Sequence, residues 1–447
     1  ALRKEGGGET HVEAGLRLFG RSEDEAGRLT FYRDHAAWCP YCQKLWLQIE
    51  LKRIPCRIER INMRSYGAKP KSFTSKVPSG LLPVVELDGR IVTESLVIMQ
   101  MLEQEFPGGD FGPYGPAMLP APGDAEGLAR ANKLLKLERV LFSDWCGLVF
   151  RPSVPGAGLF GGGAMGAFEK TLSAVDEALG ETAGHWFMGG DAPTIVDLQY
   201  VSHVERMNAS ALYWKGMQLR GAGRWKNIDK WFDAFEQLPE YRATQSDYYT
   251  TVMDIPPQYG PGFSSGGDKQ ERAAAVIDGA NWRLPLKQST RDAEPLTAHA
   301  EAAGEQAARE EAAWELSQNG DAVARFACRG MGEADGRYGA PLADPMATPD
   351  LDFLPRVDEA LRHITAALLD GSMASAARAK AAPAEGSAAA RASASAAATR
   401  AEGEGPAIAA CLEYLQRRVG VPRDMSFAAA QQLRAHIEWY KDQLSGN

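Results

Sequence analysis

Apolar and polar positions between residues 29 and 107 alternate as in a small α/β domain. The apolar run Leu29–Arg33 has strand character, and the helix-forming stretch 43–52 follows it. Residues 56–61 then alternate between apolar and polar with period two, which is typical of a half-buried strand. The pattern predicts that this domain begins with a strand, a helix and a second strand.

The second half of this region contains a hairpin signal. The apolar runs 82–87 and 90–92 flank Asp88-Gly89, a dipeptide that favours a tight turn between two strands. Thr93-Glu94-Ser95 then opens a helix whose apolar residues share one face. The predicted order is therefore strand, helix, three strands and helix, over residues 29–107.

The pattern becomes helical after a connector rich in proline and glycine at 108–125. Residues 126–259 contain apolar positions at helical spacing. Thr194-Ile195-Val196-Asp197 precedes one such run, and a Thr and an Asp three residues apart are typical of a capping box at a helix start. We expect an all-helical second domain in which the Thr194–Asp197 motif is structural.

The remainder of the chain is expected to be a helical extension. Residues 260–371 include an apolar stripe with steps of three and four residues. Residues 372–405 are mostly Ala, Ser, Gly, Arg and Glu and have too little bulky apolar surface to define a core, so they predict a flexible linker with some local helix. Two amphipathic helices at 406–447 predict a C-terminal hairpin. The glycine-rich, charged segment 1–28 is expected to be flexible.

Composition restricts the class of protein. The chain has 447 residues, with 49 Lys and Arg against 58 Asp and Glu, and no basic stripe interleaved with aromatic residues, so nucleic acid is not an expected partner. No apolar run is long enough to span a membrane. Its six cysteines are scattered apart from one pair, which favours a reducing intracellular compartment over a secreted disulfide framework. The first residue is Ala, which fits either a removed targeting peptide or a trimmed chain.

The paired cysteines carry the candidate chemistry. Trp38-Cys39-Pro40-Tyr41-Cys42 lies between the first predicted strand and its helix, which places Cys39 at a helix N-terminus. Unpaired backbone amides and the helix dipole favour a thiolate there, and a thiolate is the nucleophile of thiol–disulfide exchange. A structural zinc takes four ligands, and the sequence has neither a second such pair nor a nearby Cys/His pair. We therefore predict redox or transferase chemistry and no metal.

These motifs together resemble the glutathione transferase superfamily, specifically its cysteine-type branch of omega, lambda and dehydroascorbate-reductase-like enzymes. The resemblance covers about residues 29–245. It rests on Cys39–Cys42, on Lys69-Pro70 with 78–84, on 93–95 and on the Thr194–Asp197 motif. It implies a thioredoxin-like N-terminal α/β domain and an all-α glutathione-transferase domain. The tail resembles extensions on related proteins of plants and green algae.

The resemblance also assigns residues to glutathione, which it implies as co-substrate. Cys39 is expected to be the catalytic thiolate, and Pro83 a cis-proline whose exposed backbone pairs with the cysteinyl unit of glutathione. Glu94 and Ser95 are expected to bind the γ-glutamyl end, and Lys69 the glycyl carboxylate. The complete expected glutathione-binding set is Trp38, Lys69, Leu82, Pro83, Val84, Glu94 and Ser95. Each of these residues also has an ordinary structural interpretation: Pro83 as a trans edge-strand proline, Glu94-Ser95 as a plain helix cap, and Lys69 as a solvated loop residue.

Two site questions stay open in the sequence. Cys42 permits a dithiol mechanism, in which it resolves a mixed disulfide on Cys39, and also a monothiol mechanism without it. The second substrate is expected between the two domains beside Phe142, Trp145, Phe150 and Arg151, although core packing explains such aromatic residues equally well.

Two functions from different classes are compatible with these features. The first is a glutathione-dependent thiol transferase or reductase that acts on a small or protein disulfide, a glutathionyl adduct or dehydroascorbate. The second is a non-catalytic subunit or scaffold of a larger assembly, with the extension as a binding surface for a protein partner. Conjugation of glutathione to electrophiles is less favoured, because a cysteine thiolate favours mixed disulfides. The chloroplast and the cytoplasm both satisfy the expected reducing compartment.

Overall fold

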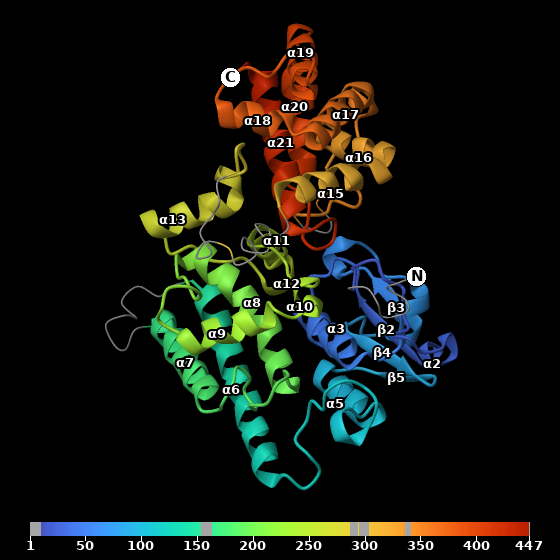
Figure 1. The fold of residues 1–447 in the computed structure, drawn as a ribbon, viewed down its shortest axis with the longest axis vertical. Helices are drawn as coiled ribbons and strands as arrows, with labels where there is room; N and C mark the ends of the chain where they lie inside the picture. Colours follow the sequence, from blue (N-terminus) through green and yellow to red (C-terminus); the bar gives the residue numbers. More distant parts are fainter. Residues whose placement is uncertain are drawn as a thin grey trace. The chain divides into compact units, whose positions relative to one another are not determined.

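The computed structural model describes residues 10–152, 163–286, 294, 304–334, 336 and 341–446. Two compact units make up the chain (Figure 1). The first unit comprises 1–245 and 258–274, and the second comprises 246–257 and 275–447. The chain thus enters the second unit, returns to the first and leaves it again. This path corrects the predicted boundary at residue 259, because 246–257 cluster with the extension.

A five-stranded mixed sheet forms the core of the N-terminal domain in the first unit. Its strand order is β1-β3-β2-β4-β5. β2 pairs in parallel with β3 and antiparallel with β4, and β4 pairs antiparallel with β5. The strands are β1 (Leu16–Arg17), β2 (Leu29–Asp34), β3 (Cys56–Ile61), β4 (Val84–Leu87) and β5 (Arg90–Val92). This arrangement confirms the thioredoxin-like α/β domain.

The predicted hairpin joins β4 to β5. Asp88 and Gly89 have φ values of 48° and 81°, so both turn residues lie in the left-handed region that a two-residue hairpin turn requires. The helix α3 (Pro40–Lys52) follows β2, and α5 (Ser95–Glu105) follows β5. The two helices pack against each other, which gives the domain its helical layer.

The described part of the N-terminal segment, residues 10–28, is structured, which corrects the expectation of flexibility for these residues. This part contains β1 and the helix α2 (Glu23–Gly27), and Val12 is buried. Arg17 forms an ion pair of 2.7 Å with Glu50 of α3, and both side chains are almost fully buried. The glycine-rich composition hid these contacts, because β1 is held by pairing with the distant β3.

The second domain of the first unit is helical, as predicted. Its long helix α8 is buried along most of its length and packs against both α3 and α6. The helices are α6 (Ala125–Val149), α7 (Gly163–Gly180), α8 (Ile195–Lys215), α9 (Lys226–Phe235) and α10 (Pro239–Arg242). Because α8 contacts both domains, it helps to fix the position of α3, together with α5 and α10.

The Thr194–Asp197 motif begins α8. The fully buried Asp197 carboxylate accepts hydrogen bonds from the Thr194 amide (2.9 Å) and the Phe187 amide (3.0 Å). It also accepts one from the Trp231 indole N–H (3.0 Å). One carboxylate therefore joins the start of α8 to a loop and to α9, which agrees with the predicted structural role.

Apart from an isolated β-bridge between Glu333 and Thr348, the regular secondary structure in the described residues of the second unit is helical. Its apolar core includes the predicted stripe residues Val357, Leu361, Ile364 and Leu368. Within the described ranges of the whole chain, no helix combines the length and apolar character needed to cross a membrane. The main helices of the unit are α11 (Tyr248–Asp254), α15 (Glu305–Gln318), α16 (Gly320–Ala327), α17 (Leu354–Asp370), α18 (Ser372–Ala379), α19 (Ala388–Ala401), α20 (Gly405–Gln416) and α21 (Phe427–Ser445).

The expected linker at 372–405 is corrected by α18 and α19. Ala389, Ala392 and Ala396 of α19 are completely buried, and this helix packs against α17 and α21. Alanine has the highest helix propensity, and its small side chain lets neighbouring helices approach closely. The helix α19 packs closely between its neighbours in the core, and this explains why residues 372–405 lack bulky apolar side chains.

Candidate functional site

Cys39 lies at the start of α3, as predicted. It is the N-cap residue, Pro40 is the first residue of the helix, and the Cys39 carbonyl accepts the amide hydrogens of Cys42 (3.1 Å) and Gln43 (2.9 Å). The Cys39 side chain is partly exposed, whereas Cys42, one turn further, is buried. The two thiols therefore differ in access, and an external reagent meets Cys39 first.

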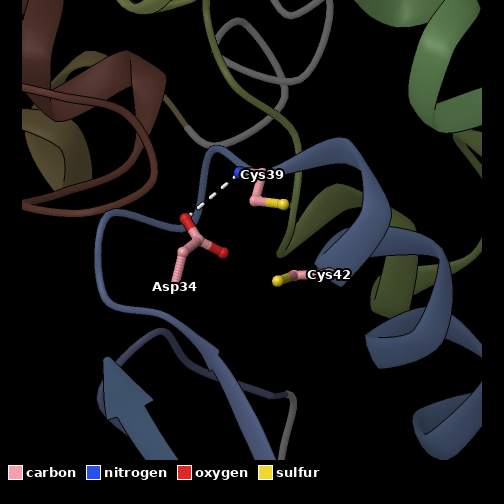
Figure 2. Close-up of side chains that lie close together, drawn as sticks. All are labelled: Asp34, Cys39 and Cys42. Carbon is pink, nitrogen blue, oxygen red and sulfur yellow. Dashed lines mark hydrogen bonds between the residues drawn. The ribbon is translucent and has the colours of Figure 1, made fainter. Parts of the chain in front are cut away.

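Asp34, the last residue of β2, faces both sulfurs (Figure 2). Its buried carboxylate accepts the backbone N–H groups of Trp38 (2.7 Å) and Cys39 (3.1 Å). These bonds hold the loop between strand and helix. Burial raises the pKa of the Cys42 thiol well above its usual value, and a hydrogen bond to Cys39 and the charges of Cys39 and Asp34 act in the same direction. Cys42 is therefore protonated near neutral pH.

Asp34, Cys39 and Cys42 also form a group of metal-ligand types. Their ligand atoms lie within 4.8 Å of one another. Three such atoms are one fewer than a closed structural zinc site takes. The Asp34 carboxylate is already engaged by two backbone amides. We derive no metal chemistry from this group.

Arg206, a buried residue of α8, also contacts the loop between β2 and α3. Arg206 donates to the Trp38 carbonyl and to the Gln43 side chain, and to the Ser202 carbonyl at 2.9 Å. The Gln43 amide in turn donates to Glu205 at 3.1 Å. The backbone before Cys39 is thus fixed by a charged group from the helical domain.

Lys44, the next residue of α3, extends this polar contact. Its ammonium donates to the Gln199 side chain of α8 at 2.5 Å. Burial lowers the pKa of Lys44 to about 8, because it disfavours the charged form. Polar groups of α3 are therefore matched individually by polar groups of α8.

The expected glutathione-binding residues on the loops are arranged as follows. The Leu82–Pro83 peptide bond is cis, which confirms the cis-proline. Pro83 and Val84 are buried, and Leu82 is partly buried. Lys69 is half-buried and donates to the Gly80 carbonyl at 2.5 Å. Burial lowers its pKa, while the charges of the CxxC sulfurs and Asp34 oppose this effect. Lys69 is therefore held by a backbone carbonyl and partly removed from solvent.

Glu94 and Ser95 begin α5. Glu94 is exposed and has φ 67°, ψ 106°, a conformation that costs energy for a residue with a side chain. Its carboxylate makes no hydrogen bond that caps the helix. Ser95 is the first helical residue, so its backbone amide has no partner inside the helix. The Glu94 carboxylate can accept from a γ-glutamyl ammonium, and the Ser95 helix-start amide can donate to the γ-glutamyl carboxylate. The Lys69 ammonium can pair with the glycyl carboxylate, so these groups fit glutathione.

The residues expected at the second-substrate site are only partly brought together. Phe142 is partly buried and contacts Trp145, with ring centroids 5.6 Å apart. Trp145 is fully buried, and its indole N–H donates to Ser210 at 2.8 Å, a position that suits a core residue. Arg151 is exposed. Phe142 therefore fits the expected role best.

Three residues near the site were not anticipated from the sequence. Asp34 stands five residues before Cys39, and Arg206 lies in a helix that is buried on nearly every side. Tyr259 comes from beyond the helical domain, yet its ring contacts Trp38, with centroids 6.3 Å apart. Only Asp34 had a local signal, an acid at the end of the strand before the CxxC motif.

Comparison with known proteins gives matches to both domains. Residues 38–105 match the family model of the glutathione S-transferase N-terminal domain, and 129–234 match that of the C-terminal domain. Glutathione S-transferase DHAR2 of Arabidopsis thaliana is 39% identical over 69 residues, which cover 15% of this chain and 31% of that protein. Protein IN2-1 homolog A of Oryza sativa is 25% identical over 211 residues, covering 47% and 78%. The chain thus matches less than a third of the Arabidopsis protein's length.

Solved structures that are similar to part of this chain include the following two. Glutathione transferase Omega 3C of Trametes versicolor has a TM-score of 0.41 and 23% identity, covering 50% of this chain and 93% of that one. Dehydroascorbate reductase of Chlamydomonas reinhardtii has a TM-score of 0.36 and 22% identity, covering 49% and 93%. Both domain models match in order, so residues 38–105 and 129–234 are similar to the N- and C-terminal domains of the glutathione S-transferase family.

Proposed function

We propose that the chain is a glutathione-dependent thiol transferase or reductase in which Cys39 is the nucleophile. The observation that carries the proposal is the asymmetry of the two thiols. Cys39 is partly exposed at a helix N-terminus, where a thiolate is favoured. Cys42 is buried beneath it, and its pKa is raised. Of the two thiols, Cys39 is therefore the one that an external substrate can reach.

The reaction follows from ordinary disulfide exchange. The Cys39 thiolate attacks one sulfur of the substrate, a mixed disulfide forms, and the other sulfur leaves as a thiolate that takes a proton from water. In a second exchange the thiolate of glutathione attacks the substrate-derived sulfur of the mixed disulfide. The S–S bond to Cys39 breaks, Cys39 leaves as a thiolate, and glutathione departs in a new disulfide with that sulfur. Because Cys42 is buried and burial raises the pKa of its thiol, we propose the monothiol route, in which Cys42 does not resolve the mixed disulfide.

Residues around Cys39 would hold glutathione. Lys69 offers a cation for the glycyl carboxylate, the backbone beside Pro83 would pair with the cysteinyl unit, and Glu94 and Ser95 offer groups for the γ-glutamyl end. The relatives' names support this co-substrate and this class of reaction, since they include a glutathione S-transferase of the DHAR type and omega-class transferases. The substrate is a small or protein disulfide, a glutathionyl adduct or dehydroascorbate, and the compartment is a reducing one, such as the chloroplast or the cytoplasm.

The test is reduction of hydroxyethyl disulfide with glutathione by the intact chain, Cys39→Ser and Cys42→Ser. We expect Cys39→Ser to lose activity and Cys42→Ser to keep most of it. Loss of activity in Cys42→Ser would replace the monothiol route with the dithiol one. Equal activity in Cys39→Ser and the parent would refute the proposal, and an inactive parent would favour the non-catalytic subunit or scaffold instead.

A further inference from the structure

Residues 258–265, which we call the strap, connect the two domains of the first unit. At its start, the Gln258 side chain donates to the Ser65 hydroxyl of the α/β domain at 2.7 Å. At its end, the Phe263 amide donates to the Val149 carbonyl of α6 at 2.9 Å. The strap is therefore anchored on both domains.

The middle of the strap lies tightly against α8. A Cβ atom on Gly262 would lie 2.2 Å from the indole of Trp214, so only glycine fits there. The Ser265 amide donates to the Trp214 carbonyl at 2.8 Å. These contacts fix the backbone a few residues after Tyr259, and they restrict where its side chain can go.

The Tyr259 ring packs among aromatic residues at the end of α6. It stacks on Phe150, with centroids 5.6 Å apart and planes at 17°. It also meets Trp145 at 5.4 Å and Phe142 at 6.0 Å, both at steep angles. The ring therefore fills the space beside Phe142, the residue that fits the second-substrate site best.

The same ring reaches a residue that flanks Cys39. It contacts the Trp38 ring with centroids 6.3 Å apart, and Trp38 immediately precedes Cys39. Tyr259 is partly exposed. It thus contacts both the aromatic end of α6 and the residue that precedes Cys39.

We propose that Tyr259 is a specificity-determining residue, which limits the second-substrate site to disulfides and adducts whose non-glutathionyl group is small. This inference rests on the proposed function, because it concerns the site beside Cys39. A bulky group on the substrate sulfur needs the volume that the Tyr259 ring occupies. The anchored strap prevents the ring from leaving without loss of its contacts with both domains.

The test is a binding measurement that needs no turnover. In a Cys39→Ser background, calorimetry gives the affinities for S-methylglutathione and S-(2-naphthylmethyl)glutathione. We expect Tyr259→Ala to raise the ratio of naphthylmethyl to methyl affinity by about tenfold or more, since hydrophobic pockets discriminate by this factor per small group. Tyr259→Trp should lower the ratio, and Tyr259→Phe, which keeps the ring, should retain it.

The outcomes separate the two proposals. This inference alone is overturned if Tyr259→Ala and Tyr259→Trp both bind S-methylglutathione and the ratio of naphthylmethyl to methyl affinity in both stays within about twofold of the parent's. Failure of the Cys39→Ser parent to bind either ligand would overturn the proposed function and the inference with it. If circular dichroism shows that Tyr259→Ala does not fold, the ratio in Tyr259→Trp decides, because the larger ring tests the same volume in the opposite direction.

Discussion

Replacing Arg206 by Met removes the charged group that holds the loop before Cys39. Arg206 is 1% exposed, donates to the Trp38 carbonyl and the Gln43 side chain, and lies 3.3 Å from the Glu205 carboxylate. Methionine keeps much of the length of the side chain and removes its charge and its donors. The variant therefore isolates the electrostatic part of the contact between α8 and α3.

The expected cost follows from what the substitution leaves behind. Loss of one partner of a buried ion pair costs about 3–5 kcal/mol, because the other charge stays buried without its partner. A buried carbonyl without a donor, here that of Trp38, costs about 1–3 kcal/mol. The two effects share one guanidinium and are not additive, so we expect a loss of about 3–5 kcal/mol in the free energy of unfolding. Displacement of Cys39 should also lower kcat/KM, by up to about a hundredfold.

Urea unfolding followed by tryptophan fluorescence measures the first effect, and hydroxyethyl disulfide reduction measures the second. Arg224→Met is the matched control, because Arg224 pairs with Glu169 at 2.7 Å while half of its side chain is exposed. That variant should lose no more than about 1 kcal/mol, as surface ion pairs do. A free energy of unfolding for Arg206→Met within about 1 kcal/mol of the control would refute the reasoning.

Three further predictions concern pH, thiol reactivity and packing. Burial lowers the pKa of His203 from 6.5 to about 4, so between these pH values the unfolded chain binds more protons than the folded one. The free energy of unfolding should therefore fall as the pH drops from 6.5 to 4, by at most about 1.4 kcal/mol per pH unit. His203→Gln should flatten this slope in urea titrations at several pH values, and an unchanged slope would contradict the assignment. Iodoacetamide at neutral pH should label Cys39 long before Cys411, whose pKa burial raises to about 12, and peptide mass mapping that found equal rates would refute this order. Ala392→Leu should destabilise the second unit by about 1–3 kcal/mol, because the larger side chain overpacks the core. Ala394→Leu, on the exposed face of α19, is the control and should have little effect. Equal melting temperatures for the two variants would argue against a packed α19.

The elements that the sequence predicted are those whose signals are local. The Asp88-Gly89 turn, the helix start at Cys39 and the Thr194–Asp197 motif each depend on residues within a few positions of one another. Turn residues and helix caps largely determine the backbone conformation of such segments, so the local sequence is enough to predict it. The same holds for the apolar stripe of α17, whose period alone indicates which face is buried.

Burial by distant partners accounts for what the sequence did not predict. Alanine in α19 looks uninformative because its role depends on the closeness of α17 and α21, which come from elsewhere in the chain. Arg206 and Asp34 act on one loop from a distant helix and from the preceding strand, and neither is part of a motif that spacing would reveal. A CxxC motif therefore predicts the chemistry of Cys39, whereas its orientation depends on contacts that only the fold brings together.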